Sequence, residues 1–184
     1  MDISWLAGLR VLWRAVVHYN SEGLITGLIM FSISSILIVI HVFAAIVWVG
    51  GMFFAYIILR PSLSSAEPPQ RLALWGSVFQ RFFPWVWLSV LALPLTGYVL
   101  IFVHFGGFGG SGVHIHIMQL TGLLMIGLFG FLYYRPYPAF KRAIGEQSWP
   151  EAAGHLNTIR IIVGINLILG LLTSVVGASG RFWG

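Results

Sequence analysis

The sequence predicts an all-α integral membrane protein, a four-helix bundle preceded by an amphipathic helix at the membrane surface. Hydrophobic residues make up 58% of the 184 residues and charged residues only 8%, whereas soluble domains carry roughly a quarter charged residues. Four apolar segments are long enough to cross the ~30 Å hydrocarbon core of a bilayer. The chain has no cysteine, which excludes disulfides, thiolate-bound clusters and zinc fingers.

The first element expected is a surface helix within residues 1–23. In the segment SWLAGLRVLWRAVVHY, apolar side chains recur on one side, and Arg10, Arg14 and His18 fall nearer the other. This pattern is typical of a helix that lies in the membrane interface. No cleavable signal peptide is evident, because the charged-then-apolar-then-small layout is missing.

Residues 24–184 form the predicted transmembrane domain. Its four spans are expected at about 31–59, 84–104, 114–134 and 159–179. Prolines mark the loop after the first span and the start of the second at Pro84. The glycine-rich stretch FGGFGGSGV joins the second and third spans, and the polar stretch YRPYPAFKRAIGEQSWPEAAGH before the fourth is expected to hold a short helix.

The distribution of positive charges predicts the topology. Seven cations lie at the connection between the first and second spans and at that between the third and fourth spans, against Arg10, Arg14 and Arg181 on the other side. Because positively charged loops stay in the cytoplasm, we expect an inner (plasma) membrane protein with both termini on the outer, periplasmic side. The net charge of +5 therefore reports topology, and no basic run indicates nucleic-acid binding.

Four of the six histidines gather toward the outer side of this topology. His41 lies in the first span, His104 ends the second, and His114 and His116 open the third. An imidazole in a membrane costs free energy unless its nitrogens are paired or bound to a ligand. His41 is therefore either a ligand or an interfacial residue above a packing seam, whereas His18 and His155 lie elsewhere.

The helix face that carries His41 continues through small and aromatic residues. Helical steps lead to Ala44, Ala45, Trp48 and Met52. The two alanines would leave a shallow recess that Trp48 closes one turn deeper, and the following Gly50-Gly51 pair permits close approach of a helix or a flat ligand.

The two histidines of the third span point about 200° apart on a helix, so they cannot both bind one metal there. We take His116 as the inward residue, because its face continues through Gln119 and small residues. His104 is a third ligand, a partner of a ligand, or a helix end in contact with water.

Three stretches resemble the copper-resistance D (CopD) family of membrane proteins. The pattern His41-x6-Trp48-x-Gly50-Gly51 followed by YIILRPSL resembles the first core helix of that family. The stretches RFFPWVWLSVLALPLTGYVL and HIHIMQLTGLLMIGLFGFLYY resemble its next two helices, so the likeness covers roughly residues 33–178. The family name implies copper handling.

The chain is also similar to the HemJ-type protoporphyrinogen oxidases, four-helix proteins that bind b-type haem. Their third helix typically opens with His-x-Lys, where this chain has His114-x-His116. The resemblance implies a haem, and the departure argues against oxidation of a porphyrinogen and favours two imidazole ligands to the iron, from His41 and His116.

The residues leave three functions open. The first is a membrane haem b protein that carries electrons between the quinone pool or a membrane substrate and an outer-side redox protein, with Arg10, Arg14 or His104 near the propionates. The second is a copper protein with an outer site made by His104, His114 and His116, although no thiolate is available. The third is a structural subunit of a membrane complex, and we expect an oligomer or subunit in any case. The sequence does not decide whether the chain is an enzyme.

Overall fold

The computed structural model describes the backbone of residues 4–183, and side chains from Gly23 onward apart from residues 24, 28, 105 and 181. All the regular structure in this part of the chain is helical, which confirms the predicted all-α class. The elements are α1 (Ser4–Ala45), the π-helix η1 (Ile46–Gly50), α2 (Gly51–Phe53), the π-helix η2 (Phe54–Leu59), α3 (Arg60–Ser62), α4 (Pro68–Phe105), the 3₁₀-helix η3 (Phe108–Gly110), α5 (Val113–Tyr134), α6 (Pro136–Gly145), α7 (Trp149–Ser179) and the 3₁₀-helix η4 (Gly180–Phe182).

The chain divides into two compact units, residues 1–39 and 40–184. Within the first unit the described backbone is one helix, the N-terminal part of α1, with no break near residue 23. The predicted division between residues 1–23 and 24–184 therefore does not coincide with a helix end. That residues 1–23 lie on the membrane surface stays a prediction.

The four predicted membrane-spanning segments are confirmed. Four stretches of the described residues are long and apolar enough to cross a bilayer: Ile25–Ser62, Pro68–His104, Val113–Gly145 and Trp149–Ser179. The chain is therefore a multi-pass membrane protein. The predicted start of the second span at Pro84 is wrong as a helix boundary, because α4 begins at Pro68 and carries Pro84 and Pro94 inside it. Transmembrane helices tolerate such internal prolines.

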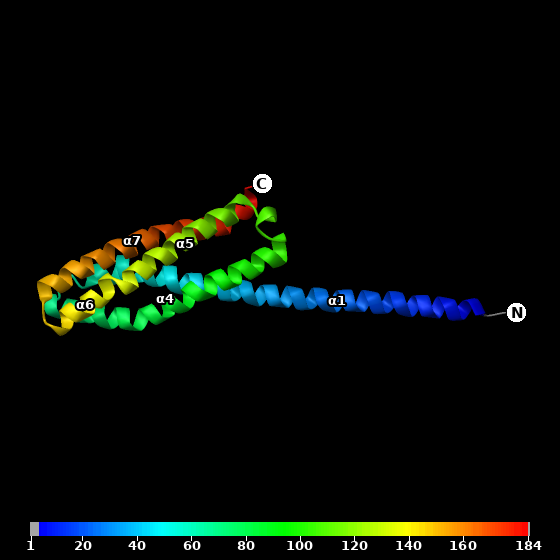
Figure 1. The fold of residues 1–184 in the computed structure, drawn as a ribbon, viewed down its shortest axis with the longest axis horizontal. Helices are drawn as coiled ribbons and strands as arrows, with labels where there is room; N and C mark the ends of the chain where they lie inside the picture. The colour runs from blue at the N-terminus through cyan, green and yellow to red at the C-terminus, as the bar shows by residue number, and fades with distance from the viewer. Residues whose placement is uncertain (1–3, 184) are drawn as a thin grey trace. The chain divides into compact units, whose positions relative to one another are not determined.

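In the second unit, α5 and α7 pack side by side along their lengths, and α6 packs against α7 (Figure 1). Aromatic side chains fill the space between α4 and α5. Phe83 and Trp87 of α4 lie edge-on to Phe129 of α5, with ring centroids 5.6 and 5.3 Å apart. Trp48 of η1 meets the same Phe129 ring at 6.2 Å. One aromatic core thus joins three of the four spans.

Asn166, which is buried in α7, ties two helices together. Its side-chain Nδ2 donates a hydrogen bond to the carbonyl oxygen of Met125 in α5, at 3.2 Å. The sequence suggests such a role, because a lone amide in a membrane helix usually finds a partner on a neighbouring helix.

The glycine-rich stretch ends α4 and turns the chain toward α5. Gly106 and Gly107 have φ of 64° and 111°, a region that residues with a Cβ rarely adopt. Both amide groups donate to the carbonyl oxygen of Ile101. We call the end of the unit that carries this turn the glycine-loop end, and the opposite end, with Arg60, Arg71 and Arg142, the arginine-rich end.

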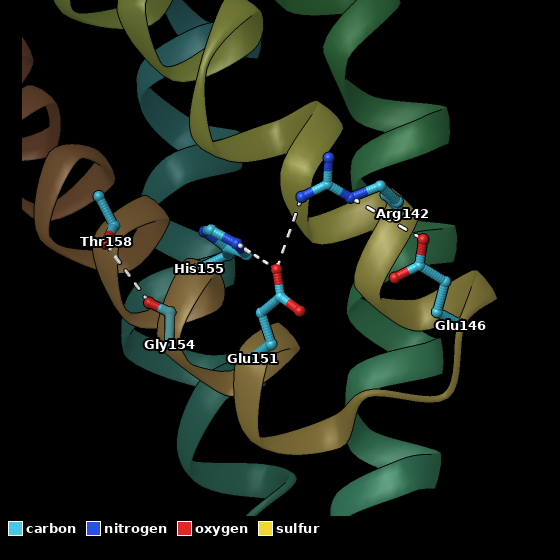
Figure 2. A network of polar contacts seen from close by, with 6 residues as sticks. All are labelled: Arg142, Glu146, Glu151, Gly154, His155 and Thr158. Atoms are coloured by element: carbon cyan, nitrogen blue, oxygen red, sulfur yellow. Dashed lines mark hydrogen bonds and ion pairs between the residues drawn. The ribbon is translucent and has the colours of Figure 1, made fainter.

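The short helix expected between the third and fourth spans is α6, at the arginine-rich end. Ion pairs lie on the surface beside it (Figure 2). Arg142 lies 3.6 Å from Glu151 and 4.0 Å from Glu146, and Glu151 lies 3.5 Å from His155. Arg142, Glu146 and Glu151 are exposed and His155 is half-buried, so these pairs contribute little to stability.

Candidate functional site

His41 lies in the last turn of α1 and contacts α4. Its Nδ1 is 2.8 Å from the hydroxyl oxygen of Thr96, a side chain that is 5% exposed. The same hydroxyl oxygen is 2.7 Å from the carbonyl oxygen of Ala92. Two oxygens this close need a hydrogen between them, and only the hydroxyl can supply it. The hydroxyl therefore donates to Ala92 and accepts from His41.

This arrangement fixes the tautomer of His41. The proton sits on Nδ1, and Nε2 keeps its lone pair. Metal-binding histidines have this arrangement, with one ring nitrogen donating to a fixed oxygen and the other free for the metal. The chemistry available at His41 is therefore that of a ligand or a hydrogen-bond acceptor.

Gly97, the neighbour of Thr96, makes room for the imidazole. A Cβ at this position would lie 3.3 Å from Cε1 of His41, tighter than most Cβ contacts. Thr96 and Gly97 were not among the predicted site residues. The signal was the Thr-Gly-Tyr run at the end of the second span, but the sequence does not reveal that its partner lies 55 residues earlier.

The helix face below His41 points into the core, as its spacing predicts. Ala44, Trp48 and Met52 are all buried, and Ala45 is half-buried. Trp48 packs edge-on against Phe129. Of the two glycines, Gly51 lies against the ring of Phe82 in α4, whereas Gly50 faces open space.

His116 and His114 leave α5 toward different neighbours. The His116 ring lies 6.5 Å from the Phe108 ring, which in turn meets Tyr98 and Phe102 of α4. His114 lies against Gly180, where any Cβ would clash with it, and 6.4 Å from the Trp183 ring. We expected His116 to be the inward residue of the two. In the structure His116 is exposed and His114 is half-buried. The reason is Gly180, whose missing side chain leaves room for His114.

The remaining predicted site residues are spread out. His104 is exposed in the last turn of α4, and the side chains of Arg10 and Arg14 lie outside the described part of the chain. No hydrogen bond or ring contact joins His41 to His116. Within the described residues, no three His, Cys, Asp or Glu side chains gather closely enough to hold a metal ion. His104, His114 and His116 thus do not form a three-donor site in this structure.

The comparisons with known proteins agree with the predicted family. Residues 76–179 match the family described as copper resistance protein D. A protein of Aquifex aeolicus (strain VF5) named "Uncharacterized protein" is 28% identical over 149 residues, which are 77% of this chain and 99% of that protein. No solved structure matches the chain. The family match takes in α4 beyond Gly76, α5, α6 and α7, and it begins after His41. Because it spans more than half of the residues, the chain belongs to the copper resistance protein D (CopD) family.

Proposed function

We propose that this chain is a membrane haem b protein that carries electrons, and that His41 would bind the haem iron. The observation that carries the proposal is the hydrogen bond from Nδ1 of His41 to Thr96. This hydrogen bond holds the imidazole in one orientation within an apolar helix, with the lone pair of Nε2 available to a metal. An iron ligand in a membrane needs both properties.

The residues near His41 fit this role. Thr96 orients the imidazole and raises its basicity, and Gly97 lets it lie close to α4. The buried Trp48 and Phe129 rings keep water away from the bundle below. His116 would be the second ligand to the iron, and His114 is the alternative. Arg10, Arg14 or His104 would neutralise the propionates.

Haem supplies reversible one-electron transfer, and two histidine ligands favour electron transfer over reaction with oxygen. The chain's own residues hold and orient the group and exclude water. The electron donor in this proposal is the quinone pool or a membrane substrate, and the acceptor is a redox protein on the outer side. A haem needs only one or two imidazoles, so the absence of a three-donor group among the described side chains does not count against it.

The test is an absorption spectrum of the detergent-purified protein, expressed with ample haem and recorded oxidised and then dithionite-reduced. We expect sharp b-type bands in the wild type and their loss in His41→Ala. The matched control is His155→Ala, which removes an imidazole at the arginine-rich end and should leave the bands unchanged. A wild-type spectrum without haem bands would overturn the proposal.

Copper handling is the second candidate, and the family description favours it. Its donors would be His104, His114 and His116 at the glycine-loop end. Copper analysis of the purified protein, compared with the triple alanine variant of these histidines, separates the two. Copper bound stoichiometrically by the wild type, lost in the triple variant and kept in His41→Ala would establish copper instead of haem.

A further inference from the structure

A groove opens between the end of α5 and the first turns of α6, at the arginine-rich end. It has a volume of about 280 Å³ and is lined by Tyr133, Tyr137, Pro138 and Lys141. Small-molecule pockets in proteins begin at roughly 300 Å³, so the groove is large enough for the ring of a small ligand. None of its lining residues takes part in the proposed haem site.

Both tyrosines of the groove have their rings packed in the aromatic core. Tyr137 is only 7% exposed, and its ring centroid lies 4.7 Å from that of Phe83 in α4. The ring centroid of Tyr133 lies 5.4 Å from that of Trp87. A tyrosine that only marks the membrane interface has its ring at the level of the lipid headgroups, whereas these two rings are held by their neighbours in the bundle. The walls of the groove are therefore a fixed part of the fold.

The polar groups of the groove are free to bind a ligand. Neither phenol hydroxyl has a hydrogen-bond partner among the described residues, and both hydroxyl oxygens are accessible from outside the protein. The ammonium group of Lys141 lies 5.7 Å from the ring centroid of Tyr137, and in the described part of the chain it forms no ion pair with a carboxylate. The groove thus offers two hydroxyls, which can donate and accept hydrogen bonds, and one ammonium group, which donates them.

This combination suits a flat ring that carries oxygen atoms. Aromatic walls favour stacked or edge-on contacts with a planar ring, and hydroxyl and ammonium groups donate hydrogen bonds to carbonyl oxygens. A phosphate would be matched less well, because only one of the four lining residues carries a charge and no arginine fork lines the groove. The exposed ring of Tyr134, 5.3 Å from that of Tyr133, adds apolar surface beside the groove for a hydrophobic tail.

We propose that this groove binds the head group of a membrane quinone. The quinone oxygens accept hydrogen bonds from Lys141 and from the hydroxyls of Tyr133 and Tyr137. The ring of the quinone lies against the aromatic walls, and its apolar tail follows the Tyr134 ring into the bilayer.

The purpose of such a site rests on the proposed function, and the site selects the quinone pool as the electron donor. Ring contacts lead from the groove into the core, since the Tyr133 ring centroid lies 5.9 Å from that of Phe129, which lies 6.2 Å from that of Trp48. Trp48 shares the helix face of His41. The groove is therefore connected through packed aromatic rings to the region of the proposed haem ligand.

The test is a titration of the detergent-purified protein with decylubiquinone and, separately, with a short-tailed menaquinone. Quenching of tryptophan fluorescence measures binding, because the Trp87 ring contacts that of Tyr133. We expect saturable quenching by at least one of the two quinones, and phosphatidylglycerol at the same concentration should not displace it. Absence of saturable quenching by both quinones would overturn the proposal, and so would displacement by phosphatidylglycerol, which would indicate a site for an anionic lipid.

Variants that lose a hydroxyl and keep the aromatic ring locate the site. Tyr133→Phe and Tyr137→Phe should each weaken quinone binding roughly 2- to 10-fold, the effect of losing one hydrogen bond, and Lys141→Gln should weaken it as well. The matched control is Tyr134→Phe, which removes an exposed hydroxyl that does not line the groove and should leave binding unchanged. Equal binding by all three tyrosine variants would overturn the proposal.

A haem spectrum of the same wild-type sample separates this inference from the proposed function. Haem bands without saturable quinone binding would overturn the quinone site alone. Quinone binding that Tyr133→Phe and Tyr137→Phe weaken, in a protein without haem bands, would support the site and overturn the proposed function alone.

Discussion

At the residue scale, the contact between His41 and Thr96 shows how far a sequence can define a site. His41 could be found because an imidazole is conspicuous in an apolar segment. Thr96 could not, since a threonine near the end of a membrane helix usually bonds only to its own backbone. Here it does that and also accepts from an imidazole 55 residues away, a pairing that only the packing of two helices creates.

Thr96→Val removes the acceptor of His41 and keeps the shape of the side chain. We expect haem affinity to fall about 10- to 100-fold, as when the partner of a metal-bound histidine is lost. The haem-to-protein ratio after purification measures this effect. Thr96→Ser should retain haem, and Thr158→Val, which lies exposed on α7, should not change it. Full haem retention in Thr96→Val would show that the hydrogen bond does not orient the ligand.

Gly97→Ala adds a methyl group 3.3 Å from Cε1 of His41. The imidazole must move by a few tenths of an ångström, so we expect shifted haem bands or partial loss of haem. Gly127→Ala in α5 is the matched control, because nothing lies within 4 Å of its added Cβ. The reduced spectra of the two variants give the comparison, and identical spectra would contradict the close contact.

At the element scale, hydropathy predicted where the spans lie but not where the helices end. The third span agrees with α5 almost to the residue, because glycine and Arg135 bracket its apolar run. In contrast, α4 and α7 begin well before their apolar segments, since nothing in the preceding polar residues stops a helix. The π-helical turns of η1 and η2 were not predicted, because a few apolar positions cannot distinguish them from α-helical turns.

Two adjacent glycines test the packing of the first span against α4. Gly51→Ala places its methyl group into the ring of Phe82, whereas the Cβ of Gly50→Ala meets nothing within 4 Å. We expect Gly51→Ala to lower the free energy of unfolding by about 1–3 kcal/mol, the usual effect of overpacking, and Gly50→Ala to leave it nearly unchanged. Unfolding in mixed micelles measures both, and equal stability of the two variants would refute this packing.

At the scale of the whole molecule, the fold class and the family were both accessible from the sequence. The low charge content and the four long apolar runs define a membrane bundle with little room for alternatives. The site was less accessible, since the two histidines of α5 differ in exposure through Gly180, at the far end of the chain. Periodicity within α5 carries no information about that neighbour.

The absence of cysteine makes the predicted topology directly testable. Single cysteines can be introduced at two exposed positions, Ser64 at the arginine-rich end and Gly109 in the glycine loop. In intact cells, a membrane-impermeant maleimide should label Gly109→Cys, and Ser64→Cys only after permeabilisation, because the arginine-rich end is expected inside. The reverse pattern would place both termini in the cytoplasm.

The π-helical turn between Ile46 and Gly50 has a consequence for the way His41 is aimed. A π-helical turn holds one more residue than an α-helical turn, so the helix contains an extra residue at this point. If this turn became α-helical, the preceding turn that carries His41 would rotate about the helix axis relative to Trp48. The imidazole would then move away from Thr96. The π-helical geometry of this turn therefore determines the direction in which His41 points. Deleting one residue from η1 would change that direction without altering the histidine itself.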